Sequence, residues 1–183
     1  IILVLFIYFL VTVGYEGILK TIAINYFGIV YVAGSITFLF LLRDFNVEPL
    51  HYTRALWLTF LGTWATDTGA YFTGKYFGKR KMASIISPNK TIEGALGGIG
   101  LTCVVVMGFL AIIDLFHYLW IIYAVLLGII AITGDLFESA IKRNAGVKDS
   151  GDFLPGHGGI LDRFDSLLFT IPFTYYYLIL FFQ

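Results

Sequence analysis

Long apolar runs alternate with short polar segments along the chain, and this pattern predicts helices that span a membrane. About 18 or more apolar residues are needed to cross a bilayer as a helix, so the shorter runs must extend into flanking residues. No sustained alternation of apolar and polar positions indicates a β-barrel. We therefore expect an all-α, polytopic transmembrane helix bundle of about six spans. The predicted spans are Ile1–Val13, Tyr26–Leu42, Ala55–Phe72, Gly94–Ile113, Tyr118–Thr133 and Leu167–Phe182.

Composition agrees with a membrane protein. Only 13% of the residues are charged, about half of the roughly 25% that is usual in soluble domains. The net charge of zero gives no reason to expect a nucleic-acid partner. Cys103 is the only cysteine and lies in an apolar run, so we expect a buried small residue rather than a disulfide or a CxxC metal site. The first run opens on Ile1 without a signal-peptide pattern, and we interpret it as a truncated helix.

Basic residues gather in two segments, 74–93 and 135–165, which two predicted spans separate. The two segments are therefore expected on the same side of the membrane. The positive-inside rule places that side in the cytoplasm. The sequence thus predicts a multi-pass integral membrane protein whose polar face meets the cytoplasm, in the inner membrane if the source is bacterial.

The segment 148–165 concentrates carboxylates, cations, glycines and one histidine between two apolar runs. Asp162 and Asp165 are three apart at the start of the last run, where they can share a helix face. Asp135 ends the preceding run. Mg²⁺ prefers one or two carboxylates, several waters and phosphate oxygens, so we expect Asp135, Asp162 and Asp165 to bind it. The alternative for Asp162 and Asp165, at the start of the last helix, is that they only complement the helix dipole.

A glycine-rich turn, 155–159, precedes the last run and is a plausible phosphate cradle. His157 within it could bind phosphate, bind metal or only hold the turn. Glu138, Ser139 and Lys142 share a predicted helix face with Asp135. The alternative for Glu138 and Lys142 is an ion pair at a solvated helix end.

Two further segments carry polar residues beside apolar runs. Asp67 lies inside the third run, and an intramembrane Asp is functional by default, with a partner to be found. Ser87 and Pro88 fit a helix start, with Thr91 near the cap. Lys90 could meet a phosphate with Glu93 orienting it, or both could snorkel to the interface. The glycine pairs at 74 and 78 and at 94 and 98 favour helix packing.

Ser139–Asp165 resembles the signature of the phosphatidate cytidylyltransferase family, SxxKRxxxxKDxxxxxPGHGGxxDRxD, at every fixed position. The segments DTGAY (67–71) and SPNKTIEG (87–94) are similar to two upstream motifs of that family, in the same order. The resemblance covers roughly residues 64–182. It divides the chain into N-terminal helices without a motif (1–54) and a catalytic membrane region (55–183).

The resemblance implies a reaction of CTP with phosphatidate that yields CDP-diacylglycerol and pyrophosphate, with Mg²⁺ as cofactor; a second cation beside it is left open. It implies CTP, phosphatidate and membrane lipids as partners, and a homodimer is left open. The rival interpretations are a CTP-dependent enzyme of another lipid, of the polyprenol kinase type, and an ion-coupled transporter. The expected catalytic residues are Asp135, Lys142, Arg143, Lys148, Asp149, His157, Asp162, Arg163 and Asp165. The expected substrate-binding residues are Asp67, Ser87, Lys90, Thr91, Glu93, Ser139, Gly156, Gly158 and Gly159.

Overall fold

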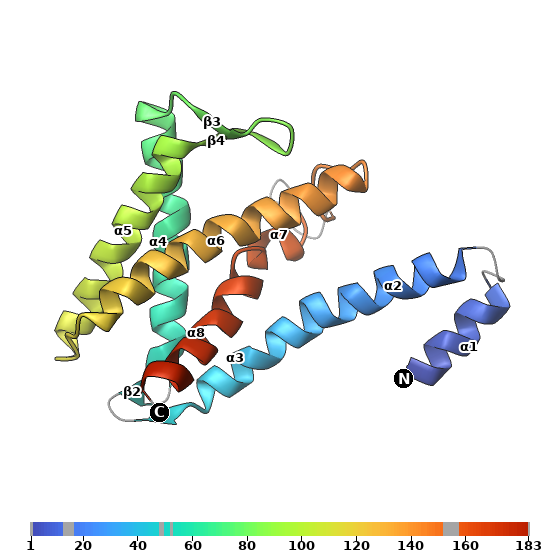
Figure 1. Cartoon of the computed structure of the whole chain (residues 1–183), viewed down its shortest axis with the longest axis horizontal. Helices are drawn as coiled ribbons and strands as arrows, with labels where there is room; N and C mark the ends of the chain where they lie inside the picture. Colours follow the sequence, from blue (N-terminus) through green and yellow to red (C-terminus); the bar gives the residue numbers. More distant parts are fainter. Residues whose placement is uncertain (1, 13–16, 48–49, 52, 152–157, 183) are drawn as a thin grey trace.

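The computed structural model describes residues 2–12, 17–47, 50–51, 53–151 and 158–182. Within these ranges the chain is a bundle of helices with two short hairpins, which confirms the all-α prediction (Figure 1). The elements are α1 (Ile2–Thr12), α2 (Ile18–Gly28), the π-helix η1 (Ile29–Gly34), α3 (Ser35–Arg43), β1 (Asn46–Val47), β2 (Leu50–His51), α4 (Arg54–Phe77), β3 (Lys81–Ala83), β4 (Ser87–Thr91), α5 (Ile92–Ile112), α6 (Leu119–Asn144), α7 (Leu161–Phe164) and α8 (Leu167–Phe182).

Among the described residues, four helical segments are long and apolar enough to cross a membrane. They are Ile18–Arg43, Ile92–Ile112, Leu119–Asn144 and Leu161–Phe182. The first joins α2, η1 and α3 into one continuous helical rod, in which α3 packs beside α8 and α2 extends away from the bundle (Figure 1). Helix α4 is 24 residues long, but its threonines, glycines and charged residues make it more polar than these four. Helix α1 has 11 residues.

Glycines let α4 and α5 pack backbone to backbone. A Cβ on Gly69 would lie 2.8 Å from the carbonyl oxygen of Gly97, and a Cβ on Gly98 would lie 2.7 Å from the carbonyl oxygen of Thr66. A Cβ on Gly94 would lie 3.1 Å from the Cα of Gly74. Small residues at a helix contact allow this close approach in membrane bundles. The sequence-based expectation that Gly94 and Gly98 serve packing is confirmed.

Threonine side chains add polar links between the packed helices. The hydroxyls of Thr66 and Thr102 are 2.6 Å apart and join α4 to α5. Thr63 donates to the Thr170 hydroxyl at 3.0 Å and joins α4 to α8. Both pairs are buried. Buried polar groups stay inside an apolar bundle at low cost only when they bond to one another or to backbone carbonyls.

Large side chains fill the opposite end of the bundle, near the loop that joins α5 to α6. Trp120 is 1% exposed and stacks on Phe182 with ring centroids 4.4 Å apart. Leu58, Leu110 and Leu127 are fully buried in the same cluster. Bulky side chains therefore fill this end of the bundle, whereas the backbone contacts between α4 and α5 occur at glycines.

A hairpin replaces the helix start that the sequence predicts at Ser87 and Pro88. This prediction was wrong: β3 pairs antiparallel with β4, and α5 begins only at Ile92. The hairpin projects from the end of α4 and the start of α5 (Figure 1). Thr91 is the N-cap of α5, and its hydroxyl accepts a hydrogen bond from the Gly94 amide at 3.1 Å. A carboxylate oxygen of Glu93 accepts bonds from the Lys79 and Arg80 amides and thereby fixes the base of the hairpin.

The glycine contact makes a testable prediction. Gly98→Ala should lower the stability of the bundle by about 1–3 kcal/mol, because the new methyl group would overlap the Thr66 carbonyl. Gly100→Ala, two residues along the same helix, meets nothing within 4 Å. It should leave stability unchanged or raise it by about 0.5–1 kcal/mol, because alanine favours a helix over glycine. Thermal midpoints in detergent measure both, and equal effects of the two changes would contradict the packing argument.

Candidate active site

The close approach of α6 to the start of α8 assembles a group of carboxylates. Gly134 permits this approach, since a Cβ there would lie 3.1 Å from the Asp165 carbonyl and 3.2 Å from the Ser166 Cα. Asp135 and Glu138 on α6 therefore lie beside Asp165. One carboxylate oxygen from each of these three residues lies within 4.8 Å of the other two. We call Asp135, Glu138 and Asp165 the carboxylate cluster.

Glu138 is the most buried member of the cluster, with no exposed surface. Its Oε2 is 2.6 Å from the ammonium group of Lys142, but its Oε1 has no hydrogen-bond partner within the described residues. The Glu138–Lys142 pair expected at a solvated helix end is thus present, but it is buried. Three adjacent carboxylates repel one another unless a cation compensates them. The all-oxygen donor set and the orphaned Oε1 fit a hard divalent cation.

The structure places Asp162 apart from the carboxylate cluster. Its Oδ1 is 2.6 Å from Lys142, and its Oδ2 accepts bonds from the Ser150 amide (2.9 Å), the Ser150 hydroxyl (2.8 Å) and the Gly159 amide (2.7 Å). Gly158 has a φ of +82°, and a Cβ there would lie 2.8 Å from Asp162 Oδ2. Asp162 therefore braces the loop between α6 and α7, and Lys142 joins this brace to Glu138.

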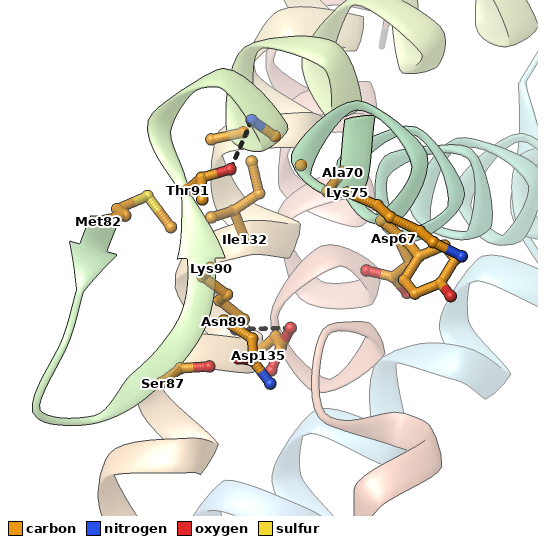
Figure 2. Close-up of a pocket in the computed structure, with 14 residues that line it drawn as sticks. Asp67, Ala70, Lys75, Met82, Ser87, Asn89, Lys90, Thr91, Ile132 and Asp135 are labelled. Carbon is orange, nitrogen blue, oxygen red and sulfur yellow. Dashed lines mark hydrogen bonds and ion pairs between the residues drawn. The ribbon is translucent and has the colours of Figure 1, made fainter. Parts of the chain in front are cut away.

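A pocket of about 540 Å³ opens beside the cluster, between α4, α6 and the β3–β4 hairpin (Figure 2). Asp67 lines it from α4, Ser87 and Asn89 from β4, and Ile132 and Asp135 from α6. Asp67 and Asp135 therefore face one pocket although 68 positions separate them in the chain. The volume lies within the range of about 300–1,000 Å³ that is typical of ligand sites.

Lys90 connects the pocket to the carboxylate cluster. Its ammonium nitrogen is 2.6 Å from Asp135 Oδ2 (Figure 2), and the Lys90 side chain is only 22% exposed. A lysine that snorkels would direct its ammonium group to water rather than to a part-buried carboxylate. Arg143 ties the hairpin to α6, because its Nε donates to the Ile86 carbonyl at 3.3 Å. The two basic segments of the sequence thus come together at one end of the bundle.

The other expected site residues occupy several environments. Arg143, Lys148, Asp149 and Arg163 are exposed, and Ser139 is half-buried on α6. Thr91 and Glu93 hold the base of the hairpin. Gly156 and His157 lie outside the described residues.

The sequence-based set of carboxylates did not include Glu138, which the structure groups with Asp135 and Asp165. It is four residues from Lys142, a spacing that ordinarily marks a solvated ion pair on a helix surface. The available signal was Gly134, which stands one residue before Asp135 and indicates a close helix contact at this position.

The chain matches the model of the family described as "Cytidylyltransferase family" over residues 1–181. The chain belongs to the cytidylyltransferase family. The match includes the first 54 residues, where the sequence shows no motif.

Similar curated proteins include the phosphatidate cytidylyltransferase of Staphylococcus aureus (strain COL), 50% identical over 127 residues, which are 68% of this chain and 48% of the relative. The phosphatidate cytidylyltransferase of Bacillus subtilis (strain 168) is 53% identical over 120 residues, covering 64% of this chain and 45% of the relative. That of Staphylococcus saprophyticus is 45% identical over 146 residues, covering 79% and 54%. The chain spans about half the length of the curated relatives it matches.

The brace around Asp162 can be tested by proteolysis. Asp162→Asn exchanges one acceptor oxygen for a donor NH₂, so it cannot keep both the Lys142 contact and the three bonds at Oδ2. We expect trypsin to cut after Lys148 several-fold faster, with and without Mg²⁺. Asp114→Asn, which removes an exposed carboxylate from the loop between α5 and α6, is the matched control. If protection in the unmodified protein appeared only with Mg²⁺, Asp162 would be a cation ligand rather than a brace.

Proposed function

We propose that this chain catalyses the reaction of CTP with phosphatidate that yields CDP-diacylglycerol and pyrophosphate. The observation that carries the proposal is a carboxylate cluster joined through Lys90 to a pocket, in a bundle of membrane-length helices. The family and the names of the relatives support the same reaction. A polyanionic nucleotide and a lipid phosphate can meet at such a site only if their negative charge is offset.

The carboxylate cluster is the proposed cation site. Asp135, Glu138 and Asp165 would hold Mg²⁺, and this set differs from the sequence-based one because Glu138 takes the place of Asp162. The bound cation would supply neutralisation of phosphate charge at the reacting centre. A second cation stays a prediction.

The proposed reaction needs little proton transfer. An oxygen of the phosphatidate phosphate forms a bond to the α-phosphorus of CTP, and the bond from that phosphorus to the bridging oxygen of the β-phosphate breaks. Pyrophosphate leaves with the electron pair. Because the attacking oxygen is already anionic, the protein's main task is to bring two anions together and hold them in line.

The pocket beside Lys90 is the proposed nucleotide site. In this proposal Lys90 exchanges its Asp135 contact for a phosphate contact, and Asn89 and Ser87, which line the pocket on the same strand, offer hydrogen bonds. Lys142 remains between Glu138 and Asp162 and holds the cluster together. The exposed Arg143, Lys148 and Arg163 are proposed to attract and bind the phosphates, and a homodimer stays a prediction.

We propose that this end of the bundle faces the cytoplasm, because both lysine- and arginine-rich segments lie there. Single cysteines at Lys79 and Ser150, in a Cys103→Ala background, should be shielded from a membrane-impermeant thiol reagent in intact cells. A cysteine at Asp114, in the loop that joins α5 to α6, should be labelled. Labelling at Ser150 from outside would contradict this orientation.

The reaction is tested by incubating the purified protein with labelled CTP, Mg²⁺ and phosphatidate. We expect pyrophosphate release and a labelled lipid only when phosphatidate is present. In a parallel incubation with a polyprenol instead of phosphatidate, release of CDP and formation of a phosphorylated polyprenol would indicate a lipid kinase. CTP left unchanged with every lipid would contradict the proposal.

Variants connect the activity to the site. Glu138→Gln keeps the size of the side chain but removes its charge, and kcat should fall by orders of magnitude. Lys90→Gln should lower kcat/KM for CTP. The corresponding loss of transition-state stabilisation should be about 1.5–3 kcal/mol, the range for a hydrogen bond to a charged group. The matched control is Lys79→Gln, which changes an exposed lysine at the base of the same hairpin. Equally small effects of both lysine changes would remove Lys90 from the site.

A further inference from the structure

Tyr31 brings the N-terminal rod to the carboxylate cluster. It lies in η1, a six-residue π-helix between α2 and α3. Its ring contacts Phe137 of α6 and Phe169 of α8, with centroids 5.7 and 5.8 Å apart. Phe137 precedes Glu138 in the chain, and Phe169 lies one helical turn beyond Asp165. These contacts position Tyr31 beside both carboxylates.

Tyr31 lies in a π-helical segment rather than in a regular α-helix. No residue of η1 is fully buried. Phe27, one turn earlier, stacks on Tyr31 at 5.5 Å with the ring planes 12° apart, and it also contacts Phe137. Short π-helical turns occur often at functional sites, because they change the direction of the side chains they carry.

The hydroxyl of Tyr31 is covered from solvent and has no hydrogen-bond partner within the described part of the chain. The charges of Glu138 and Asp165 act on it. Glu138 Oε1 and the hydroxyl of Ser166, which follows Asp165, are also buried without a partner. Leaving a buried donor or acceptor unpaired is costly, so these atoms indicate that a polar group binds at this part of the bundle.

We propose that Tyr31 is a positioning residue of the cation site, whose hydroxyl donates a hydrogen bond to an oxygen of the loaded carboxylate cluster. The inference rests on the proposed function, because it takes the cluster as the place where a divalent cation binds. It extends the site to the first 54 residues of the chain. Tyr31 would hold an oxygen in place and would not itself react.

Cation binding without substrates tests the inference. Mn²⁺ is the probe for Mg²⁺, and its binding to the purified protein in detergent is measured by electron paramagnetic resonance. Tyr31→Phe keeps the ring and its aromatic contacts but removes the hydroxyl. We expect Mn²⁺ to bind about tenfold more weakly, the loss expected for one hydrogen bond to a charged group. Tyr26→Phe, on the exposed side of the same rod, should bind Mn²⁺ like the unmodified protein.

Thermal midpoints without cation separate a packing role from a positioning role. A lower midpoint for Tyr31→Phe with an unchanged Mn²⁺ constant would overturn the inference and make Tyr31 a packing residue. Equal constants and equal midpoints for both tyrosine variants would overturn it as well. If the unmodified protein bound no Mn²⁺, or if Glu138→Gln bound it equally well, the cation site itself would be wrong. That outcome is distinct from a failure at Tyr31 alone.

Discussion

The bridge that Lys142 makes between Glu138 and Asp162 is the interaction on which the site depends. Glu138 has no exposed surface, and a lone buried carboxylate is strongly unfavourable unless a cation or hydrogen bonds compensate it. Lys142 provides one cation at 2.6 Å and uses its second contact to hold Asp162. Asp162 in turn fixes Ser150 and Gly159. A single ammonium group therefore links the buried end of the cluster to Asp162, which holds Ser150 and Gly159.

Backbone contacts at glycines set the positions of these charges. Gly134 brings α6 against the start of α8, and Gly69, Gly94 and Gly98 bring α4 against α5. Side chains with large volumes gather at the other end of the bundle, around Trp120 and Phe182. The carboxylates are thus carried by helices whose separation is fixed by backbone contact, which leaves little freedom for the cluster to spread under its own repulsion.

Much of the fold and part of the site were predictable from the sequence. Apolar runs predicted a helical membrane bundle, because the length of a run directly reflects bilayer thickness. The spacing of charges predicted that Asp135 and Asp165 belong to one site. The β3–β4 hairpin was missed, because Pro88 and the short polar strand show no alternation of apolar and polar positions. Burial of Glu138 depends on which helix faces it; Gly134 signals a close helix contact nearby but does not identify the partner helix. For Asp162, helical spacing from Asp165 predicted a shared face, whereas its oxygens turn back to the preceding loop.

The length of α6 indicates how deep in the membrane the site lies. At 1.5 Å per residue, its 26 residues measure about 39 Å. The hydrocarbon layer of a bilayer is about 30 Å thick. With Leu119 at one boundary and the helix upright, roughly the last six residues of α6 extend into the headgroup layer. Glu138 then lies at the boundary of the hydrocarbon, and Asp135 lies about 6 Å inside it. In the proposed reaction, a lipid phosphate would reach the carboxylates from the headgroup layer by sideways movement in the leaflet, while the acyl chains stay in the hydrocarbon.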